Sequence, residues 1–211
     1  MSYIYLNNGL PVVSNNSASG TDRMSTEADG TLVFQGASTV WDDLRVPLYA
    51  RSTGSAPSYT SGFAGNATLY AWYFANGATD MLHFEMQMPH GWRGTVIYPH
   101  VHWAPVTTGT GTVRWMLEWT WAEIGATYGA SSTYNMDETI STASQWKHLI
   151  TGGVGGLIPS SSQDGLSSML VGRIYRVGGG TGDTYAGSAA LLAIDFHYEL
   201  DTVGSREPTA K

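Results

Sequence analysis

Hydrophobic and polar residues alternate along much of the chain after residue 40, with the period of two that marks half-buried β-strands. The pattern is clearest in residues 112–123, where every second position from Trp115 to Trp121 is a tryptophan or a leucine. Glycine, proline and asparagine separate segments of this kind. We predict eight strands: Leu44–Ala50, Thr68–Phe74, Met81–Met88, Thr95–Trp103, Thr112–Glu123, Trp146–Ile150, Ser168–Val177 and Ala189–Leu200.

The last predicted strand shows two distinct faces, one apolar and one polar. We expect the apolar set to enter the core and the polar set to point away from it: Leu192, Ile194, Phe196 and Tyr198 against Asp195, His197 and Glu199. No segment longer than about ten residues has the helical period, which disfavours a parallel sheet with crossover helices. The pattern therefore predicts an all-β fold, an antiparallel β-sandwich of the jelly-roll type.

The first forty residues differ from the rest, because they are rich in Asn, Ser, Gly and Thr and contain only brief apolar pieces. We interpret residues 1–40 as an extended N-terminal arm, residues 41–206 as the jelly-roll sandwich and residues 207–211 as a C-terminal tail. Ordering such an arm costs entropy unless it lies on a neighbour, so the arm favours an oligomer.

The composition excludes several classes of function. The net charge is -7 and the ten Lys and Arg residues are scattered singly, so a nucleic-acid surface is not expected. There is no cysteine, which excludes disulfides, thiolate metal sites and a cysteine nucleophile. No window approaches the ~20 apolar residues of a membrane span, and the first twenty residues do not resemble a secretory signal. We expect synthesis in a cytoplasm and no membrane partner.

Histidines are concentrated in residues 83–103, which hold four of the six. On the strand that ends this segment, His100 and His102 share one face, and a His-x-His pair can supply two ligands to one metal ion. Gly94 followed by this pair resembles the opening of the cupin metal motif, but the glutamate that completes that motif is missing. Together with His197, these residues are weak metal candidates, and we favour a polar or subunit-facing surface without a cofactor.

Catalytic patterns are not found. The adjacent acids Asp42–Asp43 and Asp137–Glu138 are interpreted as solvated surface pairs, and no G-x-S-x-G elbow is present. The glycine-rich stretches 152–156 and 178–182 lack the Lys-Ser/Thr ending of a phosphate-binding loop. We therefore expect a protein that is not an enzyme.

Most aromatic residues are expected in the core or at interfaces, because tryptophan and tyrosine bury large areas. The exception is the turn Pro89–Trp92, where we expect Trp92 to be exposed. Trp92, His90 in the same turn, and Trp41 are our candidate partner-binding residues.

Several segments, in order from Trp41 to Arg206, together resemble a group of tailed-phage virion structural proteins. They are Trp41-Asp42-Asp43-Leu44-Arg45-Val46-Pro47, Gln87-Met88-Pro89-His90, Pro99-His100-Val101-His102-Trp103, Val113-Arg114-Trp115-Met116-Leu117-Glu118-Trp119-Thr120-Trp121, Asp195-Phe196-His197-Tyr198 and Asp201-Thr202-Val203-Gly204-Ser205-Arg206. The resemblance implies a virion component, made in the host cytoplasm, that decorates or cements the capsid as a homotrimer and contacts the major capsid protein. It carries over no catalytic residues.

Two alternatives remain open at this point. A receptor- or glycan-binding head-fibre or tail-associated adhesin would use the same sandwich with aromatic loops such as that of Trp92. A cupin-like metalloenzyme would use His100, His102 and His197.

Overall fold

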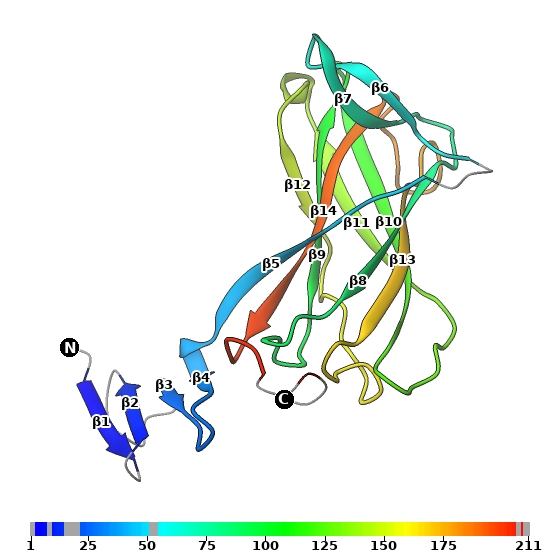
Figure 1. The fold of residues 1–211 in the computed structure, drawn as a ribbon. Helices are drawn as coiled ribbons and strands as arrows, with labels where there is room; N and C mark the ends of the chain where they lie inside the picture. The colour runs from blue at the N-terminus through cyan, green and yellow to red at the C-terminus, as the bar shows by residue number, and fades with distance from the viewer. Residues whose placement is uncertain (1–2, 8–9, 15–21, 51–54, 206–207, 209–211) are drawn as a thin grey trace.

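The structure is a computed structural model that describes residues 3–7, 10–14, 22–50, 55–205 and 208, with side chains from residue 22 onward. Eight antiparallel strands form its body (Figure 1). They are β7 (Asn66–Phe74), β8 (Met81–Gln87), β9 (Tyr98–Pro105), β10 (Gly111–Ala122), β11 (Ser132–Ile140), β12 (Leu149–Gly152), β13 (Met169–Arg176) and β14 (Ala189–Leu200).

These strands have the jelly-roll connectivity. One sheet has the order β11-β10-β13-β8 and the other has the order β12-β9-β14-β7. Each connection from β7 to β14 passes from one sheet to the other, except the β10–β11 hairpin. This alternation defines two Greek keys in two facing sheets, so the predicted fold class is confirmed.

Two further strands extend the second sheet. β6 (Ser58–Phe63) pairs with β7, and β5 (Val40–Val46) pairs with β14 over Ile194 to Leu200. β14 therefore pairs with β7 at its beginning and with β5 at its end. Between these regions, its pairing with β9 shifts by a bulge at Leu191/Ala193.

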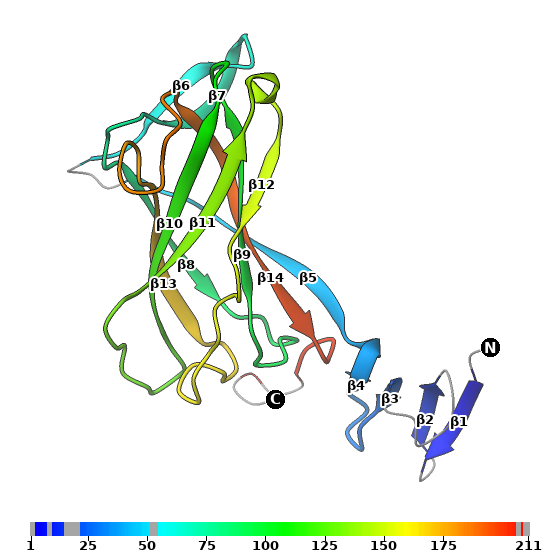
Figure 2. The same ribbon diagram turned by 180° about the vertical axis from the view of Figure 1, so that it is seen from behind.

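The chain before β5 forms a small antiparallel sheet in the order β1-β2-β3-β4, so the predicted arm contains four short strands. These are β1 (Tyr3–Asn7), β2 (Leu10–Ser14), β3 (Arg23–Thr26) and β4 (Leu32–Gln35). The sheet lies beyond one end of the sandwich in both views (Figures 1 and 2). β4 touches the segment after β14, where the Phe34 amide donates a 2.6 Å hydrogen bond to the Asp201 carbonyl. Apart from Pro208, the predicted tail 207–211 lies outside the described residues.

The core lies between the two sheets of the sandwich. Trp103 of β9 and Trp115 of β10 are fully buried, and their rings meet edge to face with centroids 5.9 Å apart. Leu117 and Trp121 are also buried, and Trp119 is partly buried against the core, so the alternating Trp and Leu residues of this strand face inward. β11 was not predicted, because this edge strand buries only Met136 and Ile140 and its sequence lacks regular alternation.

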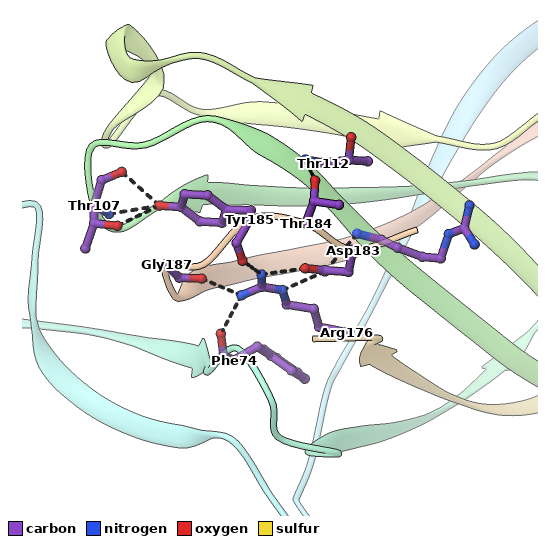
Figure 3. A network of polar contacts seen from close by, with 9 residues as sticks. Phe74, Thr107, Thr112, Arg176, Asp183, Thr184, Tyr185 and Gly187 are labelled. Atoms are coloured by element: carbon purple, nitrogen blue, oxygen red, sulfur yellow. Dashed lines mark hydrogen bonds and ion pairs between the residues drawn. The ribbon is translucent and has the colours of Figure 1, made fainter. Parts of the chain in front are cut away.

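One ion pair lies inside this core, next to the loop between β13 and β14 (Figure 3). Arg176 is 1% exposed, and its Nε and Nη2 atoms each donate a 2.8 Å hydrogen bond to the carboxylate of Asp183. Nη1 donates to the carbonyls of Phe74 (3.3 Å) and Gly187 (2.6 Å), and Nη2 also donates to the carbonyl of Tyr185. All five N–H groups of the guanidinium thus have acceptors, which a buried arginine requires.

The same loop is held at a second point by the buried side chain of Tyr185. Its hydroxyl donates a 2.8 Å hydrogen bond to the Thr107 carbonyl and accepts one of 3.1 Å from the Thr107 amide (Figure 3). Nearby, Thr184 Oγ1 accepts a 2.9 Å hydrogen bond from the Thr112 amide. The β13–β14 loop is therefore fixed to the sandwich by buried polar contacts, which the glycine-rich sequence did not indicate.

Candidate functional site

The outer face of the β12-β9-β14 sheet carries most of the histidines. On β9, Val101 and Trp103 are buried in the core, so His100 and His102 point away from it. On β14, Ile194 and Phe196 are buried, and Asp195 and His197 lie on the outer face. The predicted separation of apolar and polar residues on β14 is therefore correct from Ile194 onward.

Strand register brings these outer side chains together. Asp195 of β14 stands opposite His100 of β9, and His197 of β14 stands opposite Asp43 of β5. Because directly paired residues in antiparallel strands share a face, four groups from three strands meet at one place. We call His100, His197, Asp195 and Asp43 the histidine–aspartate cluster.

Hydrogen-bond distances within the histidine–aspartate cluster are short. His100 Nδ1 lies 3.1 Å from His197 Nε2, and the two rings are nearly perpendicular with centroids 4.0 Å apart. The same Nε2 lies 2.7 Å from Asp43 Oδ1. His197 Nε2 can carry at most one hydrogen for these two contacts, and when that hydrogen is present His100 Nδ1 faces it with its lone pair.

Asp195 is the least exposed member of the cluster, at 7%. Its Oδ2 atom lies 2.9 Å from His102 Nε2, but its Oδ1 atom is buried and accepts no hydrogen bond within the described part of the chain. Oδ1 lies 3.9 Å from His100 Nδ1 and 4.0 Å from His197 Nε2. A buried carboxylate oxygen without a donor is unfavourable, so this atom needs a partner that the described residues do not supply.

A second pair of imidazoles supports the cluster. When His102 donates through Nε2 to Asp195, its Nδ1 atom accepts, and His148 Nε2 lies 2.9 Å away as the donor. The His102 and His148 rings are stacked, with an interplanar angle of 22°. His102 is thereby held in one tautomer and one orientation.

Electrostatics favour the neutral form of His100. Burial lowers its pKa, and the neighbouring His197 lowers it further, while Asp195 acts in the opposite direction. A neutral imidazole offers a lone pair that can bind a cation. The cluster can therefore accept a cation through imidazole nitrogens and carboxylate oxygens.

The structure brings together all three weak metal candidates, His100, His102 and His197, but gives them different partners. The sequence pattern placed Asp195 on the polar face of the last predicted strand and indicated Asp43 as a solvated acid, but it gave His148 no role. Alternation placed Asp195 and His197 on one polar face. Only the pairing of β5 with β14 shows that Asp43 joins them.

The candidate partner-binding residues have different environments. Trp92 is 4% exposed and stacks on Trp121 with ring centroids 5.5 Å apart, so the prediction that it is exposed is wrong. The turn folds inward because Trp92 forms a β-bridge with Leu200, at the end of β14. The indole thus extends the core at the end of the sandwich.

The ring of His90 is occupied within the chain, because its nitrogens lie 2.7 Å from Ser205 Oγ and 3.0 Å from Ser167 Oγ. Trp41 is 54% exposed and packs edge to face on Tyr98. It lies two residues from Asp43 on the same face of β5. Among the three candidates, Trp41 therefore offers the most open surface, and it lies beside the histidine–aspartate cluster.

Other polar residues that could bind a metal ion lie in the other sheet of the sandwich. His83 and Glu85 belong to β8 and Glu118 belongs to β10, both in the β11-β10-β13-β8 sheet. Tyr49 donates a hydrogen bond to Glu85, which with burial raises the pKa of Tyr49 to about 12. Glu118 pairs with Arg173, at 2.8 Å from Nε. These residues do not converge with His100 and His197.

An exposed aromatic surface is found on the β6–β7 hairpin. Tyr59 lies 4.7 Å from Trp72 and 5.5 Å from Tyr70, measured between ring centroids. Trp72 stands opposite the buried Leu191, and Tyr70 follows it on the same face toward the hairpin turn. The inner face of the sheet thus continues into solvent, with Tyr59 and Tyr70 both more than half exposed.

The protein is thus a jelly-roll β-sandwich that carries the histidine–aspartate cluster on the outer face of one sheet. No model of a known protein family and no curated protein matches the chain. Among solved structures, this chain is similar to a chain in the structure of infectious bursal disease virus Gx strain. The TM-score is 0.41 and the sequence identity 7%, and the match covers 95% of this chain and 43% of that chain. The chain thus spans less than half of that viral chain.

Two further similarities are to sugar-complexed proteins. The Clostridium thermocellum xylanase 10B CBM22-1–GH10 modules with xylohexaose have a TM-score of 0.34 and 10% identity, over 79% of this chain and 27% of that one. TmCBM61 in complex with β-1,4-galactotriose has a TM-score of 0.30 and 10% identity, and the match covers 76% of this chain and 88% of that chain. Such distant similarities carry no argument about function, and the jelly-roll assignment rests on the strand order of the chain itself. In the described residues, no helix is long and apolar enough to span a membrane.

Proposed function

We propose that this chain is a non-enzymatic structural protein of a phage virion. In this proposal it assembles as a homotrimer and decorates or cements the capsid by contact with the major capsid protein, without nucleic acid or membrane as a partner. The phage resemblance of the segments between Trp41 and Arg206 supports the proposal. A jelly-roll sandwich with its loop fixed by Arg176 is a stiff scaffold of the kind that such a role needs.

The observation that carries the proposal is the β1-β2-β3-β4 sheet. It is a single layer beyond the end of the sandwich, and no other strand of the described residues lies over it in Figure 2. On its described part, Met24 and Phe34 form a cross-strand pair that stays partly exposed. Because a sheet is stable when one face packs against another element, we infer that a neighbouring subunit or the shell supplies that element.

Native mass measurement and particle binding test this proposal. We expect the full chain to have the mass of a trimer at micromolar concentration and to sediment with purified capsids that lack it. A variant without residues 1–35, confirmed as folded by circular dichroism, should lose at least about 1.4 kcal/mol of association free energy, which is a tenfold weaker interaction. A monomeric full chain that does not sediment with capsids would contradict the proposal.

Glycan binding is a second candidate function, supported by the aromatic surface of Tyr59, Tyr70 and Trp72. Exposed aromatic rings of this kind can pack on a ligand, whereas the buried Trp92 cannot. If this function holds, Tyr59→Ala and Tyr70→Ala should each weaken binding on a glycan array by about tenfold. Tyr128→Ala, which removes another exposed tyrosine, is the control and should bind as the wild type does. Equal binding by all variants would exclude this surface.

A further inference from the structure

We propose that the histidine–aspartate cluster is a binding site for a divalent transition-metal ion such as Zn²⁺. The ligands are His100 Nδ1, His197 Nε2, Asp195 Oδ1 and Asp43 Oδ1. Two nitrogens and two carboxylate oxygens form a donor set suited to this class of ion. The site differs from the one considered from sequence, because Asp195 and Asp43 take part and His102 does not bind the ion directly.

The distances suit a small tetrahedral site. Bonds of about 2.0–2.1 Å to a tetrahedral ion place the ligand atoms roughly 3.4 Å apart. His100 Nδ1, His197 Nε2 and Asp195 Oδ1 are separated by 3.1, 3.9 and 4.0 Å. The ligand atoms of these three residues all lie within 4.8 Å of one another. Movements of less than 1 Å therefore bring these three atoms to tetrahedral spacing. Asp43 lies outside this group of three, and its 61% exposed side chain, 2.7 Å from His197 Nε2, would have to turn toward the ion to become the fourth ligand.

An unmet electrostatic need points to a cation rather than to a purely hydrogen-bonded cluster. Asp195 Oδ1 is buried and accepts no hydrogen bond among the described residues, although Arg45 stands opposite Asp195 on β5. Next to it, His197 Nε2 contacts both Asp43 and His100 and can offer them at most one hydrogen. A divalent ion would bind the four ligand atoms together and would offset the buried negative charge of Asp195 and the exposed negative charge of Asp43.

The surrounding residues already hold the ligands in position. His102 binds Asp195 Oδ2 and is itself held by His148, so Oδ1 is directed toward the other two ligands. Outer contacts of this kind are typical of metal sites. Gly152 stands opposite His100, and a Cβ atom there would lie 2.7 Å from the His100 ring. The absence of a side chain at residue 152 therefore leaves room for this ligand.

The position of the site indicates what metal binding would do to the fold. Asp43 belongs to β5, the strand that connects the β1-β2-β3-β4 sheet to the sandwich, and the other ligands belong to β9 and β14. A bound ion would join all three strands. We therefore expect metal binding to stabilise the attachment of β5, and through it the placement of the N-terminal sheet.

Calorimetric titration of the untagged full chain tests the site. After treatment with a chelator and removal of the chelator, we expect ZnCl2 to bind at one ion per chain with a dissociation constant of about 10 µM or lower. At a zinc concentration about a hundred times that constant, the Tm should rise by about 5–10 °C. A dissociation constant above about 1 mM, or several ions bound per chain with equal and weak affinity, would overturn the proposal.

Matched histidine variants locate the site. His197→Ala should weaken zinc binding by about a hundredfold or more, and Asp43→Asn by about tenfold or more. His90→Ala removes a histidine outside the cluster and should leave the affinity unchanged. His197 and Asp43 are partly exposed, so these variants should fold, which circular dichroism checks. Equal affinity of His197→Ala and wild type would overturn the assignment.

Discussion

Replacement of Arg176 by glutamine should lower the free energy of unfolding by about 3–5 kcal/mol. Arg176 is fully buried, and its removal leaves the Asp183 carboxylate charged without its guanidinium partner. The carbonyls of Phe74 and Gly187 also lose their donor. Urea denaturation followed by tryptophan fluorescence measures the change, and the decrease should appear as a lower midpoint at an unchanged slope.

An exposed ion pair is the matched control for this variant. Arg93 is bound to Glu199 at 2.9 Å, and its side chain is 42% exposed. Arg93→Gln should therefore lower the free energy of unfolding by no more than about 1 kcal/mol. If Arg176→Gln costs as little as Arg93→Gln, then the buried network does not hold the β13–β14 loop in the way described.

Replacement of Trp92 by alanine should lower the free energy of unfolding by about 3–5 kcal/mol, because it opens a cavity beside Trp121. Trp41→Ala, which removes an exposed indole, should cost less than about 1 kcal/mol. Both variants replace tryptophan by alanine, so they differ only in whether the lost ring is buried or exposed. Thermal and urea unfolding of both proteins measure the difference.

Opposite outcomes for the two tryptophans would be informative. If Trp92→Ala unfolds as the wild type does, then the turn Pro89–Trp92 is open in solution and Trp92 is available to a partner, as the sequence suggested. If Trp41→Ala is the strongly destabilised variant, then Trp41 contributes to the packing of β5 beyond its contact with Tyr98.

The alternation of hydrophobic and polar residues was sufficient to predict the fold class. Seven of the eight jelly-roll strands overlap a predicted segment, and β11 is the exception. The eighth predicted segment, Leu44–Ala50, overlaps β5, which lies outside the jelly-roll path. The predicted number of strands therefore equals the number in the jelly roll only because the missed β11 and the additional segment at β5 cancel. Alternation succeeds in the central strands because most residues on the inward face of each are buried.

At Leu192 the alternation fails, although it holds for the rest of β14. The bulge beside this residue buries Leu191 and leaves Leu192 exposed, so the predicted face begins only at Ile194. A bulge depends on how two strands pair, and the sequence of one strand does not reveal it. The buried state of Arg176 was missed for a related reason, since its acceptors come from β7 and from the loop before β14.

The sequence by itself determined the all-β class, the inward and outward residues of the central strands, and the histidines of β9 and β14 as one polar set. Only the tertiary structure decided that Asp43 and His148 join these histidines, that Trp92 is buried, and that residues before β5 form a sheet. The division has a physical reason. Alternation is a local property of each strand, whereas strand register and ring burial depend on contacts between residues far apart in the chain.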